Sequence, residues 1–141
     1  MSAEDPYDLH RFVEAQAQDY ARALSEVRAG QKRSHWMWYV FPQIEGLGTS
    51  AMARRYSIKS AAEARAYLEH PLLGKRLREC FAAVKDIDGR SALEIFGAPD
   101  DLKLRSSATL FAAVSGEPLF DDVLQKYFDG VRDEATLLRL K

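Results

Sequence analysis

The chain contains the stretch SHWMWYVFPQIEGLGTS at residues 34–50, and this stretch decides how the rest of the fold must be arranged. It holds both tryptophans, Trp36 and Trp38, together with Tyr39 and Phe41. Aromatic side chains this dense need a core or a ligand to cover them, because large exposed apolar patches are unusual in soluble monomers. We therefore expect the stretch to lie either in the core or at a binding site.

Amphipathic helices are predicted on both sides of this stretch. Before it, apolar residues from Leu9 to Val27 recur at spacings of three, four and seven, which predicts a helix over residues 6–29 that ends at Gly30. After it, capping boxes at Ser60–Glu63 and Ser91–Glu94, prolines, glycines and helical spacing predict further helices at residues 50–56, 60–70, 71–86, 91–97, 99–115, 118–128 and 133–140. The predicted helix at 99–115 is rich in small residues, which would let a neighbouring backbone approach closely. No run of four or more residues alternates as a strand would. We predict an all-α fold, a single compact orthogonal helical domain of about seven or eight helices over residues 1–141.

The composition is that of an ordinary globular protein, with 47% hydrophobic and 29% charged residues. The net charge of −1 argues against a nucleic-acid polymer or a membrane as partner. The single cysteine cannot form an internal disulfide, the N-terminal segment is acidic and polar, and no apolar run approaches the roughly 20 residues that a membrane helix needs. We expect a cytoplasmic protein. The histidines do not stand at metal-ligand spacing, so we predict no metal and no cofactor.

The charges are unevenly distributed along the chain. Residues 27–62 contain six basic residues and one acidic residue, whereas residues 86–134 contain eleven acidic and five basic residues. A bound anion is therefore expected near the aromatic stretch. The alternative is that these basic side chains face water and pair with the acidic half of the chain.

The aromatic stretch is one of several recognisable motifs. These are Leu9–Gln16 (LHRFVEAQ), His35–Gln43 (HWMWYVFPQ), Gly46–Gly48 (GLG), Tyr56–Ile58 (YSI), His70–Gly74 (HPLLG) with Leu77, and Lys103–Ser106 (KLRS). In them, and over nearly its whole length, the chain resembles the bacterial domain of unknown function family eighteen-ten. The resemblance implies a small helical protein and brings no established activity, cofactor or catalytic residue. Some members carry a calpastatin label, which would imply a protease inhibitor, but calpastatins are long disordered repeat proteins.

No motif of an enzyme class is present, so the sequence leaves open whether the protein is an enzyme. His35 is the best candidate for acid–base catalysis, because histidine side chains titrate near physiological pH and this one stands beside two tryptophans. Its alternative role is to hydrogen-bond a backbone carbonyl in the core. Cys80 would be a nucleophile only if the fold brought it to His35, and we expect a buried, inert thiol.

The residues predicted to bind a ligand surround the aromatic stretch. Trp36 or Trp38 would stack on a planar group, while His35 and Gln43 would form hydrogen bonds. The glycine-flanked start of the helix at Ser50, with Arg54 one turn on, would hold an anion, and one of Lys103 and Arg105 would reach the same pocket. The predicted ligand-binding residues are Arg33, His35, Trp36, Trp38, Gln43, Gly48, Ser50, Arg54 and Arg105. The alternative is an ordinary turn and cap beside tryptophans that fill the core.

Two functional hypotheses follow. The first is that the protein binds an anionic small molecule, a nucleotide or a phosphorylated metabolite, at residues 33–55. The second is a protein–protein interaction module in which an exposed aromatic patch docks a partner or a second copy of the chain. A concave pocket bounded by residues 33–55 and 103–105 would favour the first, and a flat aromatic patch would favour the second.

Overall fold

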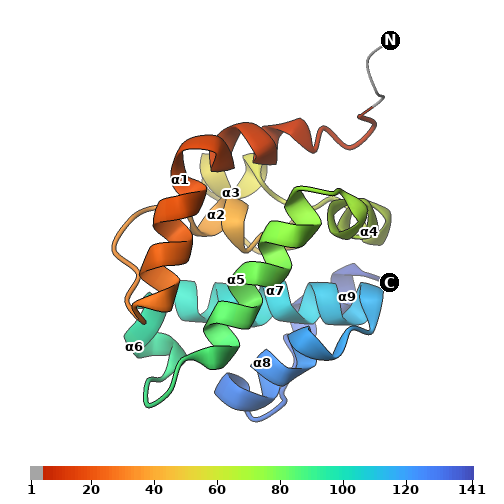
Figure 1. The fold of residues 1–141 in the computed structure, drawn as a ribbon. Helices are drawn as coiled ribbons and strands as arrows, with labels where there is room; N and C mark the ends of the chain where they lie inside the picture. Colours follow the sequence, from red (N-terminus) through yellow and green to blue (C-terminus); the bar gives the residue numbers. More distant parts are fainter. Residues whose placement is uncertain (1–4) are drawn as a thin grey trace.

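A computed structural model describes residues 5–141 and contains nine α-helices in that range (Figure 1). They are α1 (His10–Arg28), α2 (Met37–Val40), α3 (Ala51–Arg55), α4 (Ala61–Glu69), α5 (Leu73–Asp86), α6 (Ala92–Phe96), α7 (Asp100–Ser115), α8 (Pro118–Phe128) and α9 (Glu134–Arg139). The described residues contain no strand beyond an isolated parallel bridge between Ile44 and Ile58. The all-α prediction is confirmed.

Two long helices, α5 and α7, organise the packing. In Figure 1, α7 runs across the molecule behind α5. The α7 helix packs against α4, α6, α8 and α9, whereas α5 packs against α1, α4 and α8. None of the helices between residues 5 and 141 has the length and apolar character required to cross a membrane.

All eight predicted helices are present, and α2 is an additional single turn inside the aromatic stretch. The structure corrects the start of the first helix, which is His10 and not residue 6. Asp8 has a positive φ of 52°, which separates Pro6 from the helix. The N-cap of α1 is Leu9, and the Asp5 carboxylate accepts hydrogen bonds from the backbone N–H groups of Leu9 (2.8 Å) and His10 (2.9 Å).

The two predicted capping boxes differ. Ser91 and Glu94 form the complete reciprocal pair at the start of α6. Ser60 accepts a hydrogen bond from Glu63 N at 3.1 Å, but the Glu63 carboxylate does not return to Ser60. It binds Arg11 and the backbone N–H of Lys59 instead. The capping box at Ser60 is therefore only half formed, because the Glu63 carboxylate binds Arg11 of α1 instead of the backbone of Ser60.

A chain of aromatic rings connects the aromatic stretch to the central helices. Phe41 meets Phe81 edge to face at 5.0 Å, and Phe81 meets Phe120 in the same way at 5.0 Å. Phe120 then contacts Phe111, which contacts Tyr67. Edge-to-face geometry is favourable for aromatic pairs. These ring contacts therefore stabilise the packing of the aromatic stretch against α4, α5, α7 and α8.

Candidate functional site

A cleft of about 480 Å³ lies between residues 43–53 and the N-terminal part of α7. Its walls come from the aromatic stretch, α3, α7 and the start of α9, and are formed by Gln43, Leu47, Gly48, Thr49, Ser50, Ala53, Pro99, Leu102, Lys103, Ser106, Asp133 and Ala135. The cleft is a concave site bounded by residues from both segments named in the sequence analysis, residues 33–55 and 103–105. Of the pair Lys103 and Arg105, it is Lys103 that lines the cleft.

Gln43 is the polar group shared by the cleft and a narrow neighbouring pocket that also contains Trp38 and Tyr56. Its backbone carbonyl accepts a hydrogen bond from Ile58 N at 2.8 Å, which fixes the position of the residue. Within residues 5–141 its side-chain amide has no hydrogen-bond partner. The amide is therefore available to a bound molecule as two donors and one acceptor.

Lys103 stands over one tryptophan and shares an acid with a second lysine. Its Nζ lies 5.4 Å from the centre of the Trp38 ring and 3.2 Å from Asp100 Oδ1. The other carboxylate oxygen of Asp100 lies 2.9 Å from Lys32 Nζ, which in turn is 5.2 Å from the Trp36 ring. One carboxylate in the first turn of α7 thus holds two ammonium groups, each over an indole ring.

The glycines before α3 are required for close packing. A Cβ on Gly48 would lie 2.6 Å from the Ala53 side chain, so the absence of a side chain lets the loop approach α3. Gly46 has a φ of +98° and faces the guanidinium of Arg139. Ser50 Oγ accepts a hydrogen bond from Ala53 N at 3.1 Å and caps α3 from within the chain.

Gln43, Gly48 and Ser50 are thus the predicted ligand-binding residues that lie at the cleft, with half-buried Trp38 in the neighbouring pocket. Trp36 does not line the cleft, because its ring is fully buried in the core and its Nε1 donates to Glu26 Oε1 at 2.9 Å. Tyr39 and Phe41 are also buried, so these three aromatics form no exposed patch.

The predicted basic residues and His35 lie elsewhere. Arg33 is exposed and donates to Gln31 Oε1 at 3.0 Å. His35 is exposed and is not among the residues that line the cleft. Arg105 donates to the backbone carbonyls of Val131 (3.1 Å) and Arg132 (2.9 Å), so it ties α7 to the segment before α9.

Arg54 lies outside the cleft because of helical geometry. Ala53 faces the cleft, and the next residue of a helix points about 100° away around the axis. Arg54 therefore lines a different hollow, together with Arg11 and Arg55.

Sequence reasoning missed the part of the cleft that comes from the end of the chain. Asp133 caps α9, and its Oδ2 accepts hydrogen bonds from Ser106 Oγ (3.1 Å) and Thr136 N (3.2 Å). Asp133 N in turn donates to Thr109 Oγ1 at 2.9 Å. The small residues of α7 indicated that a neighbour would approach closely, but no pattern in the sequence identified α9 as that neighbour.

Glu26 positions the chain that enters the aromatic stretch. Its carboxylate accepts hydrogen bonds from the backbone N–H of Arg33 (2.8 Å), from Ser34 N (2.9 Å) and Oγ (2.6 Å), and from Trp36 Nε1 (2.9 Å). Burial by itself would raise the pKa of Glu26. The hydrogen bonds outweigh burial and lower this pKa from 4.5 to about 2.

The thiol of Cys80 is inaccessible, and His70 hydrogen-bonds to backbone. The thiol is fully buried, and burial is the main reason why its pKa is raised to about 12. His70 Nδ1 accepts hydrogen bonds from the backbone of Leu72 (3.1 Å) and Leu73 (3.2 Å), and so begins α5. The described part of the chain contains no group of three or more His, Cys, Asp or Glu side chains that could hold a metal ion.

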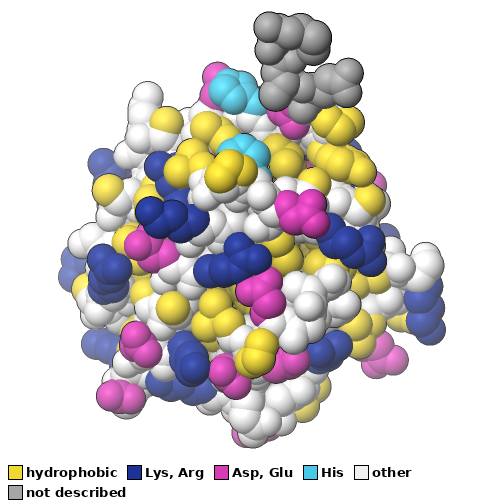
Figure 2. Space-filling view, turned by 45° about the vertical axis from the view of Figure 1, so that its right-hand side comes forward, with side chains coloured by type: hydrophobic (Ala, Val, Ile, Leu, Met, Phe, Trp, Pro, Cys, Tyr) yellow, Lys and Arg dark blue, Asp and Glu magenta, His cyan; other side chains and the backbone are white. Residues whose placement is uncertain are grey.

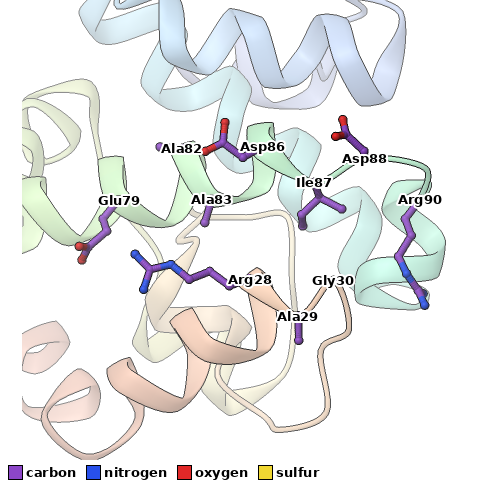
Figure 3. Close-up of a pocket in the computed structure, with 10 residues that line it drawn as sticks. All are labelled: Arg28, Ala29, Gly30, Glu79, Ala82, Ala83, Asp86, Ile87, Asp88 and Arg90. Carbon is purple, nitrogen blue, oxygen red and sulfur yellow. The ribbon is translucent and has the colours of Figure 1, made fainter.

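Two further hollows lie outside the cleft, one between α1 and α5 and one beside His10 and His70. Figure 3 shows a groove of about 490 Å³ between α1 and α5, in which Arg28 extends toward Glu79 while Asp86 points away from it. The charged groups of this groove do not converge on one point. Figure 2 shows hydrophobic side chains gathered around histidines on one face. An apolar groove with His10 and His70 in its walls lies between the start of α1 and the turn before α5.

Residues 6–140 match the family described as "Protein of unknown function (DUF1810)". The chain belongs to this family. Its DUF1810 fold is also similar to the crystal structure of the conserved hypothetical protein Rv1873 from Mycobacterium tuberculosis, with 55% sequence identity and a TM-score of 0.95. The similarity covers 96% of this chain and 98% of that one. No curated protein matches the chain. All the walls of the cleft lie inside the part that matches DUF1810.

Proposed function

We propose that this DUF1810 protein binds a small organic molecule with one anionic group, a nucleoside monophosphate or another phosphorylated or carboxylated metabolite, in the cleft between residues 43–53 and α7. One observation carries the proposal. Gln43, whose side-chain amide forms no hydrogen bond within residues 5–141, and Lys103 line the same open cleft.

The walls of the cleft suit the organic part of such a ligand. Leu47, Ala53, Pro99 and Leu102 supply apolar surface, and Leu102 is 55% exposed although it is a large hydrophobic residue. Small-molecule sites are typically concave, largely apolar and between about 300 and 1,000 Å³, with few polar groups that fix the orientation of the ligand. Gln43 and Lys103 would be those polar groups here.

The charges limit the ligand to a single anionic group. Lys103 is the cation of the cleft, and Asp133 is an acid already engaged by Ser106 and Thr136. When Lys103 turns to a ligand, Asp100 keeps Lys32 as its partner at 2.9 Å. Lys103 can therefore turn to a ligand without leaving the Asp100 carboxylate unpaired. A polyphosphate would find too few cations in the cleft.

A thermal-shift screen tests the proposal. The panel pairs nucleoside monophosphates, sugar phosphates and carboxylates with their uncharged counterparts. Ligand binding to the folded state raises the midpoint of unfolding, so we expect the charged member of at least one pair to raise it and the neutral member to raise it less. Gln43→Ala and Lys103→Met should remove the shift.

Lys75→Met is the matched control, because Lys75 is an exposed lysine on α5 outside the cleft. It should leave the ligand effect intact. If no compound raises the midpoint, or if Lys103→Met and Lys75→Met respond alike, the cleft is not the binding site.

We further propose a cytoplasmic location in a bacterial cell. The lone, buried Cys80 is compatible with a reducing compartment, and Rv1873 comes from a bacterium.

A further inference from the structure

A second hollow, distinct from the cleft, lies on the other side of α3. It measures about 250 Å³ and is lined by Tyr7, Asp8, Arg11, Arg54, Arg55, Lys59 and Glu63. The cleft shares none of these residues. Three segments that are separate in the sequence meet here, namely the approach to α1, the end of α3 and the beginning of α4.

Arg11 forms the floor of this hollow and fixes its walls. Its Nε donates to the carbonyl of Arg55 (2.8 Å), its Nη1 to those of Tyr7 (2.7 Å) and Asp8 (2.8 Å), and its Nη2 to that of Ser57 (2.7 Å). The remaining N–H donates to Glu63 Oε2 at 2.7 Å. All five donors of the guanidinium are used, so Arg11 cannot bind a ligand itself but holds the backbone on both sides of the hollow in place.

The buried floor of the hollow carries no net charge, whereas its exposed rim carries a net positive charge. Arg11 and Glu63 are buried and neutralise each other. On the rim, Arg54 forms no ion pair with any residue between 5 and 141, and Arg55 donates only its Nε, to Tyr56 Oη at 3.3 Å. The third rim cation, Lys59, has an exposed contact with Glu45 at 3.9 Å, which contributes little.

The acid on this rim is Asp8, which is exposed. Two arginines and one lysine therefore face one carboxylate at the edge of a pre-formed hollow. The paired N–H groups of arginine guanidiniums and the ammonium of a lysine can donate hydrogen bonds to the oxygens of a tetrahedral dianion. A bound anion would also reduce the electrostatic repulsion between the three cations. We infer that this hollow is a phosphate-binding site in which Arg54, Arg55 and Lys59 contact the phosphate group of a phosphomonoester or of free phosphate.

The half-buried side chain of Tyr7 forms part of the same wall. It would lie against the organic part of a phosphomonoester, whereas free phosphate would leave it uncovered. The inference does not depend on the function proposed for the cleft, because the two sites share no residue.

The test is a titration of the ¹⁵N-labelled protein with inorganic phosphate, with sodium chloride at equal ionic strength as the reference. We expect saturable shifts of the backbone amides of residues 54–59 and of Tyr7 and Asp8, but not of the amides that line the cleft. A phosphomonoester that also shifts the Tyr7 ring resonances would identify the phosphate as part of an organic ligand.

Two double variants with the same change in net charge make the titration specific. Arg54→Gln with Arg55→Gln should weaken phosphate binding by roughly tenfold or more, as expected for lost charge-assisted hydrogen bonds. Arg22→Gln with Arg65→Gln removes two exposed arginines on α1 and α4 and should leave binding unchanged. All four arginine side chains are exposed, so both double variants should keep the fold.

Lys103→Met separates this site from the cleft and should leave phosphate binding unchanged. The inference is overturned if the shifts do not saturate, if chloride reproduces them, or if the two double variants bind phosphate equally well.

Discussion

Arg11 Nη2 and Glu63 Oε2 form a 2.7 Å ion pair in which both side chains are almost completely buried. The pair joins α1 to the first turn of α4 across 52 residues of sequence. Because every other N–H of Arg11 binds a backbone carbonyl, this guanidinium also connects the approach to α1 with the segment after α3. Charged groups this buried are tolerated in proteins only when they are paired and hydrogen-bonded.

The first prediction concerns this pair. Replacing Arg11 with Met leaves Glu63 buried without its counter-charge and removes four hydrogen bonds to backbone carbonyls. We expect the free energy of unfolding, measured by urea denaturation, to fall by about 3–5 kcal/mol. The double variant Arg11→Met with Glu63→Met should be more stable than Arg11→Met alone, because it removes the unpaired charge. A double variant that is no more stable than the single one would show that the carbonyl contacts, and not the ion pair, dominate.

The second prediction concerns Glu26 and pH. In the folded protein the pKa of Glu26 is about 2, below the 4.5 of an unperturbed glutamate. The folded state therefore binds this proton less well than the unfolded state. The stabilisation by the Glu26 carboxylate is fully present above pH 4.5 and is lost as the pH falls toward 2.

Glu26→Gln should lower stability near neutral pH by about 1–3 kcal/mol, because it weakens hydrogen bonds to a buried indole and three other donors. It should also flatten the decline of the melting temperature between pH 4.5 and 2.5, as followed by circular dichroism. Glu69→Gln, at an exposed position at the end of α4, is the control and should follow the wild-type pH profile. Parallel pH profiles for wild type and Glu26→Gln would contradict the role of Glu26.

The third prediction concerns the thiol of Cys80. Burial raises its pKa to about 12, and the side chain has no exposed surface. The thiolate is the reactive form, so we expect native protein at pH 8 to react with a disulfide reagent such as DTNB only when the fold opens. The rate should rise by orders of magnitude in 6 M urea and should also rise in Arg11→Met. Rapid reaction of the native wild type would show that Cys80 is accessible.

Local signals in the sequence predicted the helices well, because caps, prolines and spacing act over a few residues. Pro118–Phe128 has the predicted bounds, and Ser91 forms the predicted capping box. Gln16 lies on the apolar face of the first helix, where a buried polar group needs a partner, and its amide donates to the carbonyl of Tyr39 at 2.7 Å. The single turn α2 was missed, because four residues are too few to show a helical period.

The candidate site was predictable only where its parts are neighbours in sequence. Gln43, Gly48 and Ser50 come together because one short loop carries them. Arg54 follows the same loop but points to the other side of α3, and Asp133 reaches the cleft only through the packing of α9 on α7. The structural roles of Glu26 and Arg11 could not be predicted from the sequence, because a charged residue on a helix is usually solvated. Most of their hydrogen-bond partners are backbone groups, which leave no pattern in the sequence.

The fourth prediction concerns Gly74, which lies in the motif HPLLG. A Cβ at this position would lie 2.1 Å from the backbone oxygen of Leu68, at the place where α5 crosses the end of α4. Because this contact is with backbone, α4 or α5 must shift to relieve it, and the buried contacts of both helices are disturbed. Overpacking of this kind costs about 1–3 kcal/mol or more.

We therefore expect Gly74→Ala to lower the free energy of unfolding by at least that amount in urea denaturation, although alanine favours helices more than glycine does. Lys75→Ala, at the exposed next position of the same helix, is the control and should change stability by less than about 0.5 kcal/mol. If Gly74→Ala were as stable as the wild type, α4 and α5 could not be packed as closely as the structure has them.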